Sequence, residues 1–415
     1  METQLTLDPN PRPLACALGR AAPRYSVRMH HSIREVDPVA WDRVVSGRSL
    51  MMQRATLEAI ERGSPGNREH RHAVFSRDGK PIGVACFEIA RFEGPTIEPM
   101  LGESAAARLA ARVAGLGGQL SFDLLVCGST FSCGEHGFAF VPDAHPREAL
   151  TSLYEAIRRI RRECRHVAGM LFKEFDLTSG PLPGMLDDRG FSEIPMGAKM
   201  VLDLDPSWDS FEGYLVCLKS KFRIKAKRAR TKSRNLRVAD LGLDDLVRHR
   251  TRLESLRDAV IEKATYRLGG VNVGSLIELR RALSDEFVIR GYWLGDDLVG
   301  FMTGFVDGGT LDAHTVGFDY RLNRDHSIYP RMLVDYLEIA IDRGLARVNY
   351  GRTAEEIKST LGAAPVPTRC YVRHRSHVVN PMLPLVARYI RPEEFTQRRP
   401  FKSGHGGLAP GREAA

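Results

Sequence analysis

Two stretches of this 415-residue chain, far apart along the sequence, repeat the same order of expected elements. Residues 73–90 and 288–307 each read as two strands joined by a tight turn, Asp78-Gly79 in the first and Gly295-Asp296 in the second. After each hairpin come a further strand, a long amphipathic helix, a short strand, a glycine and a final strand. This repeated order predicts two copies of one α/β unit. The matching segments are the helices 146–164 and 329–343, the strands 168–175 and 346–350, and the glycines Gly190 and Gly362.

The excess of basic residues is concentrated in one short segment. The chain has 60 lysines and arginines against 51 aspartates and glutamates, a formal net charge of +9. Segment 219–237 holds ten basic residues and no acidic one, so it accounts for the whole excess. We expect a basic helix over 218–237, in which a strip of small residues docks between two basic rows. Such a helix is either a solvated surface or a site for a phosphate-bearing partner: a nucleotide, coenzyme A, tRNA or acidic lipid head groups.

Composition bounds the class of protein and its organisation. Hydrophobic residues make up 43% of the chain and charged residues 27%, which is typical of folded proteins with a large core. No apolar run is long enough to span a membrane, no signal peptide is recognisable, and seven scattered cysteines argue for a reducing cytoplasm. We expect a flexible leader at 1–24, an N-terminal domain at 25–205, a C-terminal domain at 206–395 that opens with the basic helix, and a disordered tail at 396–415.

The order hairpin, strand, helix, strand, helix, strand is similar to the fold of the GNAT, or acyl-CoA N-acyltransferase, superfamily. Two such units with a basic helix opening the second resemble its Fem-like, double-GNAT branch. The resemblance covers roughly residues 70–375 and implies an α/β protein with two tandem GNAT-like mixed-sheet domains packed together. The residues that carry it are the basic helix from Lys219, the run Glu262-Lys263-Ala264, the run from Gly317 to Tyr320, Tyr329, Tyr350 to Thr353, Lys358 and Gly362.

The resemblance also implies acyl-CoA as the donor substrate, with no cofactor held permanently. The phosphates of such a donor need backbone N–H groups or cations. The usual glycine-rich phosphate loop is missing, because segment 320–329 contains no glycine. Cations are therefore expected to replace the loop amides. The candidates are Arg223 and Lys227 on the basic helix, and Lys263, Arg321, Arg324, Arg352 and Lys358 elsewhere in the second half.

Acyl transfer to an amine needs a base for the ammonium proton and an acid for the leaving group. Glu135 and His136 stand in a glycine-flanked loop, where the alternative is a turn without a catalytic role. Asp312 and His314 are two residues apart on an expected strand, so both side chains are expected on one face. The alternative for His314 is a hydrogen-bonded core histidine. Tyr329 begins the next helix and is a candidate acid, with a packed aromatic as the alternative.

Together these patterns predict a cytoplasmic N-acyltransferase that moves an acyl or aminoacyl group from a thioester or similar donor to an amine by direct attack. The acceptor is expected to be a cell-wall precursor, a lipid amine or a small metabolite, with peripheral contact to an acidic membrane left open. The alternatives are a protein that binds nucleic acid or acidic membranes through 219–237 without catalysis, and an inactive scaffold. No DNA partner is expected, because aromatics do not interleave with the basic residues. No metal is expected, because Cys127 and Cys133 lack a second nearby pair.

Overall fold

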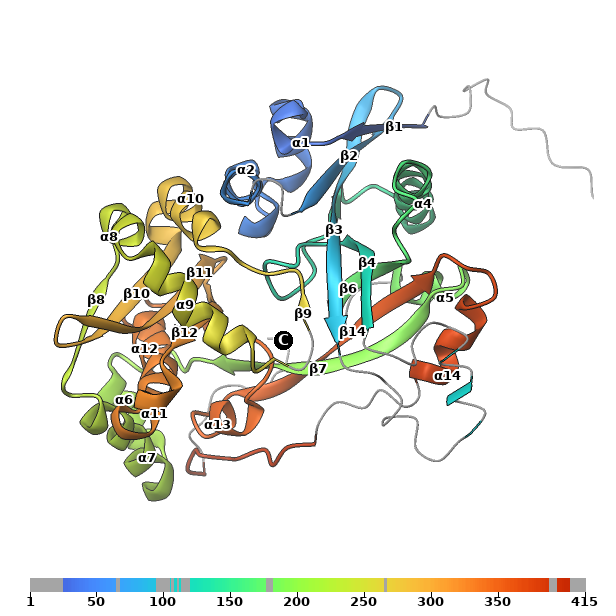
Figure 1. The fold of residues 1–415 in the computed structure, drawn as a ribbon. Helices are drawn as coiled ribbons and strands as arrows, with labels where there is room; N and C mark the ends of the chain where they lie inside the picture. The colour runs from blue at the N-terminus through green and yellow to red at the C-terminus, as the bar shows by residue number, and fades with distance from the viewer. Residues whose placement is uncertain are drawn as a thin grey trace, which may run out of the picture.

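The computed structural model describes residues 25–64, 68–94, 120–176, 182–264, 267–387 and 394–403, with four single positions between 95 and 119. The predicted leader, 1–24, lies outside these residues. Within them, fourteen strands form one mixed sheet with helices packed on it. Figure 1 shows two halves side by side, with two long strands crossing between them. None of the described helices is long and apolar enough to span a bilayer.

The first half follows the predicted order of elements. Its long helix α4 begins at Pro146, where His145 and Glu148 form a capping box around the first turn. The apolar face of α4, which includes Leu153 and Ile157, packs on the sheet in the core of this half. The elements are β1 (Tyr25–His30), α1 (Pro38–Val45), α2 (Arg54–Gly63), β2 (Glu69–Arg77), β3 (Lys80–Gly94), β4 (Leu120–Cys127), β5 (Phe138–Phe140), α4 (Pro146–Glu163), β6 (Gly169–Asp176), α5 (Leu182–Asp187) and β7 (Ser192–Asp203).

The second half repeats this plan. Its long helix α12 is buried along most of its length, with Met332 and Leu337 fully covered by the sheet and neighbouring helices. The elements are α6 (Phe211–Cys217), α7 (Ser220–Lys232), β8 (Leu236–Asp240), α8 (Leu243–Arg248), α9 (Arg250–Ile261), β9 (Arg267–Leu268), α10 (Val273–Leu283), β10 (Phe287–Leu294), β11 (Asp297–Asp307), β12 (Thr310–Phe318), α11 (Tyr320–His326), α12 (Ile328–Asp342), β13 (Arg347–Asn349), α13 (Glu355–Ser359), β14 (Ala364–His374) and α14 (Leu383–Ala387).

Both predicted hairpins are confirmed, and they share an irregularity. The β2–β3 register leaves Ile82 as an extra residue directly before Gly83, and the β10–β11 register leaves Val299 extra directly before Gly300. A Cβ at either glycine would collide with a neighbouring side chain. The same β-bulge at the same place in both halves is what a duplicated unit predicts, because such bulges are retained as structural features.

The two halves exchange their last strands. Strand β7, which ends the first half, pairs with β14 over much of its length and with β13 at its end. Strand β14, which ends the second half, also pairs with β6 of the first half. Figure 1 shows β7 and β14 running together from one half to the other. Each half therefore completes its sheet with a strand from the other, so the two units share one continuous sheet.

Three predicted segments differ from the structure. Helix α7 covers Ser220–Lys232 rather than 218–237, because the chain turns after Lys232 and residues 236–240 pair with β10 as an edge strand. Arg237 therefore leaves the basic helix and stacks on Trp293, with its guanidinium carbon 4.1 Å from the ring centroid. The long polar helix expected over 243–264 is two helices, α8 and α9, which meet at His249. The glycine-free segment after β12 was expected to be a loop, and it contains the helix α11.

The prediction of a disordered tail is wrong for residues 396–403. Phe401 stacks on Trp208, with ring centroids 5.6 Å apart, and bridges to Leu218 in the antiparallel sense. The backbone N–H of Lys219 donates a hydrogen bond of 2.8 Å to the carbonyl of Pro400. An aromatic anchor thus holds this segment against α6. The remainder of the predicted tail, 404–415, lies outside the described residues.

Candidate active site

Strands β12 and β13 run parallel for three residue pairs and then diverge. The last pair joins Asp312 to Asn349. Beyond this pair β12 continues alone on that side, while the chain after β13 turns at Gly351, whose φ is +68°. Thr353 and Ala354 also have positive φ, which is costly for residues with side chains. Strained backbone of this kind is concentrated at functional sites, so the divergence of the two strands is a candidate site.

Asp312 stands at this divergence as a half-buried carboxylate. Its Oδ1 accepts a hydrogen bond of 2.7 Å from the side-chain amide of Asn349. Burial raises the pKa of Asp312 to about 6, and the nearby Asp307 acts in the same direction. At neutral pH the group is ionised. Its raised pKa makes it a stronger base than an ordinary aspartate. Asp312 can therefore accept a proton.

His314 follows on the same strand, but both of its ring nitrogens have partners. Nε2 donates to the carbonyl of Phe131 at 2.6 Å, and Nδ1 lies 3.0 Å from the hydroxyl of Thr303, which can donate to it. The imidazole also stacks on the Phe131 ring, with centroids 4.6 Å apart. Loss of hydration lowers the pKa of His314 to about 4. The neutral ring therefore joins the second half to a loop of the first.

The side chain of Tyr329 is half-buried at the start of α12. Its ring stacks on Phe318, with centroids 5.6 Å apart, and its backbone N–H donates to the side-chain oxygen of Asn323 at 2.9 Å. Burial raises the pKa of Tyr329, with Tyr320 and Glu355 acting in the same direction. Among the described residues no hydrogen-bond partner is found for its hydroxyl. The phenol is thus a neutral donor that remains available to a substrate.

A loop of the first half, residues 128–137, reaches the same region. Its Phe131 holds His314, and its Cys133 lies beside Gly351, just past the divergence of β12 and β13. His136 on this loop donates from Nε2 to the carbonyl of Cys133 at 3.0 Å. Burial, reinforced by the charge of Lys173, lowers the pKa of His136 to about 4. Glu135 is exposed. The structure therefore brings the loop that carries Glu135 and His136 against the strand that carries Asp312 and His314.

Two buried charges that the sequence analysis did not single out hold this loop in place. Glu174 has a φ of +57° and accepts a hydrogen bond of 2.6 Å from the backbone N–H of Gly134. It also pairs with the Lys173 ammonium at 3.2 Å and with the Arg352 guanidinium at 2.8 Å. Although burial opposes it, these two cations hold the pKa of Glu174 below its usual value. A signal was present, because Lys173 and Glu174 are adjacent charges inside an otherwise apolar strand.

Arg352 and Lys358, two predicted phosphate ligands, are engaged within the protein. Arg352 pairs with Glu174 and also contacts the side chain of Cys133. Lys358 is buried, and its Nζ donates to the carbonyls of Arg352 at 2.7 Å and Gly351 at 3.3 Å. Burial lowers the pKa of Lys358 to about 8. These contacts brace the strained turn after β13.

The other predicted cations lie on the surface around the start of α12. Arg321 is exposed and makes two hydrogen bonds to the Asp319 carboxylate. The Lys263 ammonium lies 3.5 Å from the centroid of the Tyr320 ring. The start of α12 has few free amides for a phosphate, because the N–H of Tyr329 is capped and the next residue is Pro330. The remaining candidates are Arg324, exposed on α11, and Arg223 and Lys227 on α7.

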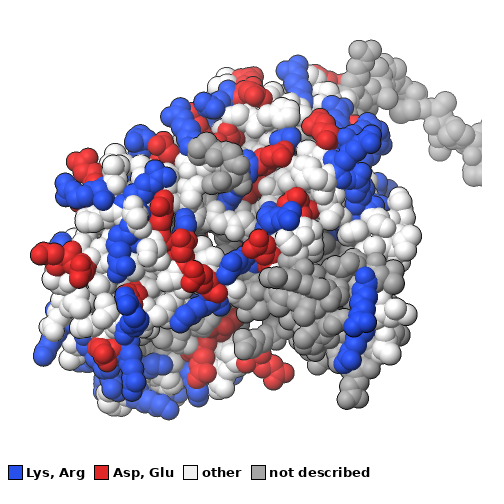
Figure 2. Space-filling view, in the orientation of Figure 1, with Lys and Arg blue, Asp and Glu red and all other residues white. Residues whose placement is uncertain are grey.

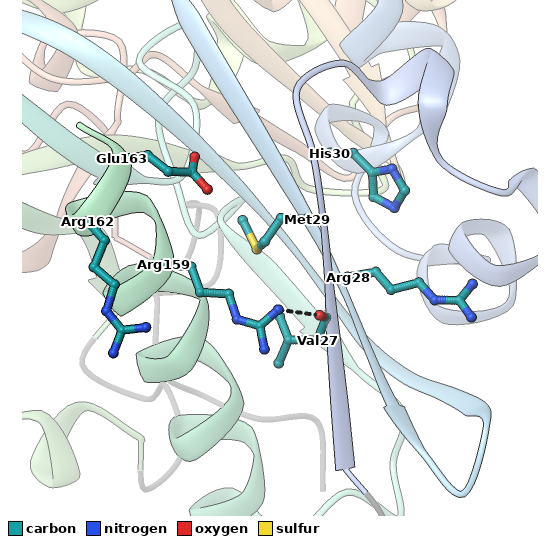
Figure 3. A pocket seen from close by; sticks show the side chains of 7 residues that line it. All are labelled: Val27, Arg28, Met29, His30, Arg159, Arg162 and Glu163. Atoms are coloured by element: carbon teal, nitrogen blue, oxygen red, sulfur yellow. Dashed lines mark hydrogen bonds between the residues drawn. The ribbon is translucent and has the colours of Figure 1, made fainter.

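A separate pocket of about 590 Å³ lies at the sheet edge formed by β1, at the far end of the strand order from β12. Figure 3 shows Val27 and Met29 facing α4, while Arg28 and His30 lie on the opposite side of the strand. Arg159 of α4 donates a hydrogen bond of 2.8 Å to the carbonyl of Val27. This contact covers part of the unpaired strand edge, which gives the arginine a protective structural role.

Comparisons with known proteins agree with this architecture. The family described as acetyltransferase (GNAT) domain matches residues 220–359, which include β12, α12, β13 and the candidate site. A tandem GNAT protein from the clavulanic acid biosynthesis pathway superposes with a TM-score of 0.50 at 12% identity, covering 85% of this chain and 99% of that protein. FemX superposes with a TM-score of 0.49 at 11% identity, covering 83% of this chain and 96% of FemX. No curated protein sequence matches the chain.

The family match supplies the acyltransferase domain, and the similarity to the tandem GNAT protein covers both halves. The predicted fold class, two mixed-sheet units packed together, is confirmed by the strand order and the repeated bulge. Residues 220–359 therefore match an acetyltransferase (GNAT) domain, and the chain has the fold of a tandem, double-GNAT protein.

Proposed function

We propose that this protein is an N-acyltransferase that moves an acyl group from acyl-CoA to an amine at the divergence of β12 and β13. The observation that carries the proposal is Asp312, a carboxylate with a pKa of about 6 placed where the parallel strands separate, inside the segment that matches the GNAT domain. Tyr329, with a hydroxyl free of hydrogen bonds to other described residues, is the second group that supports it.

The reaction needs only these two proton-transfer groups and a bound thioester. The Asp312 carboxylate takes a proton from the acceptor ammonium, and the neutral nitrogen attacks the thioester carbonyl. As the tetrahedral intermediate collapses, the C–S bond breaks and the Tyr329 hydroxyl gives its proton to the leaving thiolate. The new amide nitrogen sheds its second proton, which returns the tyrosine to its neutral form. No covalent enzyme intermediate is required.

Two features of the second half suit a coenzyme A thioester. Past Asp312, β12 has no paired strand on the β13 side in the part of the chain that the structure describes, and the amides of a pantetheine arm can pair with such an edge as an added strand does. The phosphates would meet side-chain cations rather than helix amides, because the start of α12 is capped. Arg324 and Lys263 are exposed at this end of α11 and α12 and are the proposed phosphate ligands.

Thermal unfolding against a donor panel tests the proposal. The panel is coenzyme A, acetyl-CoA, long-chain acyl-CoAs and a charged tRNA. A ligand at about 100 times its Kd adds about 2.7 kcal/mol to the unfolding free energy, enough to raise Tm by several degrees. We expect a shift with acyl-CoAs, and its dependence on chain length identifies the acyl group. A shift with tRNA alone would overturn the thioester donor.

Release of free thiol from the bound donor then identifies the acceptor. Amine-bearing cell-wall precursors, lipid amines and small polyamines are compared at saturating acyl-CoA. We expect one class to accelerate thiol release, with an N-acylated product confirmed by mass. Acyl-CoA that binds but is never consumed with any amine, under conditions where the protein is folded, contradicts catalysis and leaves a binding role.

A further inference from the structure

The outer face of helix α7 gathers several exposed cations. Lys221, Lys227 and Arg228 are exposed there, and none of them forms an ion pair with a described residue. Arg230, on the inner side of the same helix, instead pairs with Glu338 at 3.1 Å. Lys221, Lys225 and Arg228 follow one another at spacings of four and three on the helix, where like charges repel, so binding of an anion would relieve this repulsion.

An aliphatic side chain stands in the middle of these cations. Ile224 is 62% exposed, and it lies one helical turn from Lys221, Lys227 and Arg228. The inner face of α7 carries small buried side chains, such as Ala226, that pack against the rest of the protein. Ile224 lies on the opposite face of the helix and points away from the protein. Cations surrounding an exposed aliphatic tip are typical of helices that lie at a lipid surface, where the tip enters the acyl boundary and the cations meet head groups.

A second exposed aliphatic residue precedes the helix. Val216 is 61% exposed on α6, just before the chain enters α7. Figure 1 shows α6 and α7 together at the lower left corner of the molecule, and Figure 2 shows lysines and arginines gathered at that edge. The apolar and cationic groups therefore occur on one protruding corner, which can approach a flat surface without hindrance from the sheet.

This corner packs against the helices that lead to the candidate active site. Helix α7 packs against α12, and the Lys232 ammonium donates a hydrogen bond of 3.0 Å to the carbonyl of Arg324 on α11. Arg331 of α12 lies 3.4 Å from the hydroxyl of Ser233 at the end of α7. Because α12 begins with the turn that carries Tyr329, a partner docked on α7 sits on the same helical layer as the site.

We propose that the outer face of α7 docks the protein on an anionic lipid bilayer, with Ile224 and Val216 entering the interface and the cations contacting phosphate head groups. The charge of the face is complementary to anionic lipid, and the two aliphatic tips select a bilayer over other polyanions. A nucleic acid offers no place for an exposed isoleucine, and α7 exposes no aromatic ring on which bases could stack. This inference goes beyond the proposed chemistry and does not depend on it.

Flotation of the full-length protein with phosphatidylcholine vesicles, with and without phosphatidylglycerol, tests the docking surface. We expect binding only when phosphatidylglycerol is present, and weakening as salt is added. Removing one cation from such a surface lowers partition about fivefold, so Lys221→Glu combined with Arg228→Glu is expected to lower it more than tenfold. Ile224→Ser removes no charge and is expected to lower vesicle partition about threefold or more.

A matched control lies on helix α8, where Val247 is 61% exposed beside the exposed Arg248. Val247→Ser combined with Arg248→Glu alters the same residue types outside the proposed surface and is expected to leave partition unchanged. Circular dichroism and Tm confirm that every variant is folded. The decisive comparison measures Ile224→Ser in two assays: vesicle flotation, and filter binding to a single-stranded RNA. Loss of vesicle binding with RNA binding unchanged supports lipid docking.

Three results overturn the proposal. One is equal partition onto vesicles with and without phosphatidylglycerol. Another is unchanged partition of the α7 charge variant. The third is tight, salt-sensitive RNA binding that requires Lys221 and Arg228 while vesicle binding is absent, which assigns the surface to nucleic acid. None of these outcomes bears on acyl-CoA binding, so the docking surface and the proposed catalysis fail or stand separately.

Discussion

Each half of this protein contains one corresponding pair of parallel strands, and the residues at the last position of that pair differ in polarity. In the first half, β4 and β6 separate after Cys127 and Phe172, two buried apolar side chains. In the second half, β12 and β13 separate after Asp312 and Asn349, which hydrogen-bond to each other. In the first half β4 stops at this pair and β6 continues, whereas in the second half β13 stops and β12 continues, so the two ends differ in backbone as well as in side chains.

The space beyond each strand pair is also used differently. In the first half it is followed by the loop 128–137, whose backbone is held by the buried carboxylates of Glu88 and Glu174. In the second half the corresponding segment contains α11 and leads to Tyr329 of α12, whose hydroxyl has no hydrogen-bond partner among the described residues. The loop of the first half thus lies against the candidate site of the second half. Fold and chemistry are thus separable even within one chain.

Replacing Asp312 is expected to have the largest effect. Asp312→Asn keeps the shape and the contact with Asn349 but cannot take a proton, so we expect kcat for thiol release to fall about 100-fold to 10,000-fold. The matched change in the first half is Cys127→Ala, which we expect to cost about 1 kcal/mol of stability and to leave kcat unchanged. An equal loss of activity in both variants would place catalysis in neither half alone.

Removing the charge of Glu174 is expected to have the next largest effect, on stability. Glu174→Gln leaves the buried Lys173 and the half-buried Arg352 without their counter-charge, so we expect the unfolding free energy in urea to fall by about 3 kcal/mol. The control is Glu193→Gln, because Glu193 on β7 is a partly exposed partner of Arg369. This variant is expected to change the unfolding free energy by less than about 1 kcal/mol. A small loss at Glu174 would contradict its role in holding the loop.

The second half is expected to make the stability of the protein depend on pH through Asp312. The raised pKa of Asp312 means that the folded protein binds this proton more tightly than the unfolded chain does. The carboxyl therefore favours folding at low pH, and its contribution is lost as pH rises from about 4 through about 6. Asp312→Asn is expected to raise Tm by a few degrees above pH 6 and to have no such effect at pH 4.

The same group should appear in the kinetics of the wild type, where kcat/KM rises with pH through about 6 as Asp312 ionises. Cys127→Ala is expected to change neither profile, because burial raises the pKa of that thiol and it stays protonated. Calorimetric scans at several pH values measure the stability profile. A Tm difference for Asp312→Asn that is the same at pH 4 and pH 8 contradicts the assigned pKa.

The sequence supported the duplication and the order of elements along the chain well, because turn residues and hydrophobic periods are local signals. The hairpins around Asp78-Gly79 and Gly295-Asp296 are where the pattern predicts them. It did not reveal that β7 and β14 cross between the halves, since strand exchange leaves the local pattern unchanged. The pairing of His314 with Phe131 likewise depends on a contact between residues 183 positions apart.

Charge patterns along the sequence gave a wrong helix boundary in one place and did not indicate a buried ion pair in another. Basic spacing extended the predicted helix to Arg237, although that residue belongs to an edge strand and stacks on Trp293. The adjacent Lys173 and Glu174 interrupt an apolar strand, and only the structure gives them partners in both halves. The roles proposed for Asp312 and Tyr329 rest on the chemistry that acyl transfer to an amine needs.

The smallest expected effect compares the two bulge glycines. A Cβ at Gly83 would lie 2.3 Å from the Phe140 ring, which is held by stacking on Phe75, with centroids 5.5 Å apart. A Cβ at Gly300 would meet the terminal methyl of Met332 at 2.8 Å, a flexible group that can shift. We expect Gly83→Ala to destabilise the protein by about 3 kcal/mol and Gly300→Ala by about 1 kcal/mol in urea unfolding. Equal losses would mean that the two bulges are packed alike, contrary to the different contacts at Gly83 and Gly300.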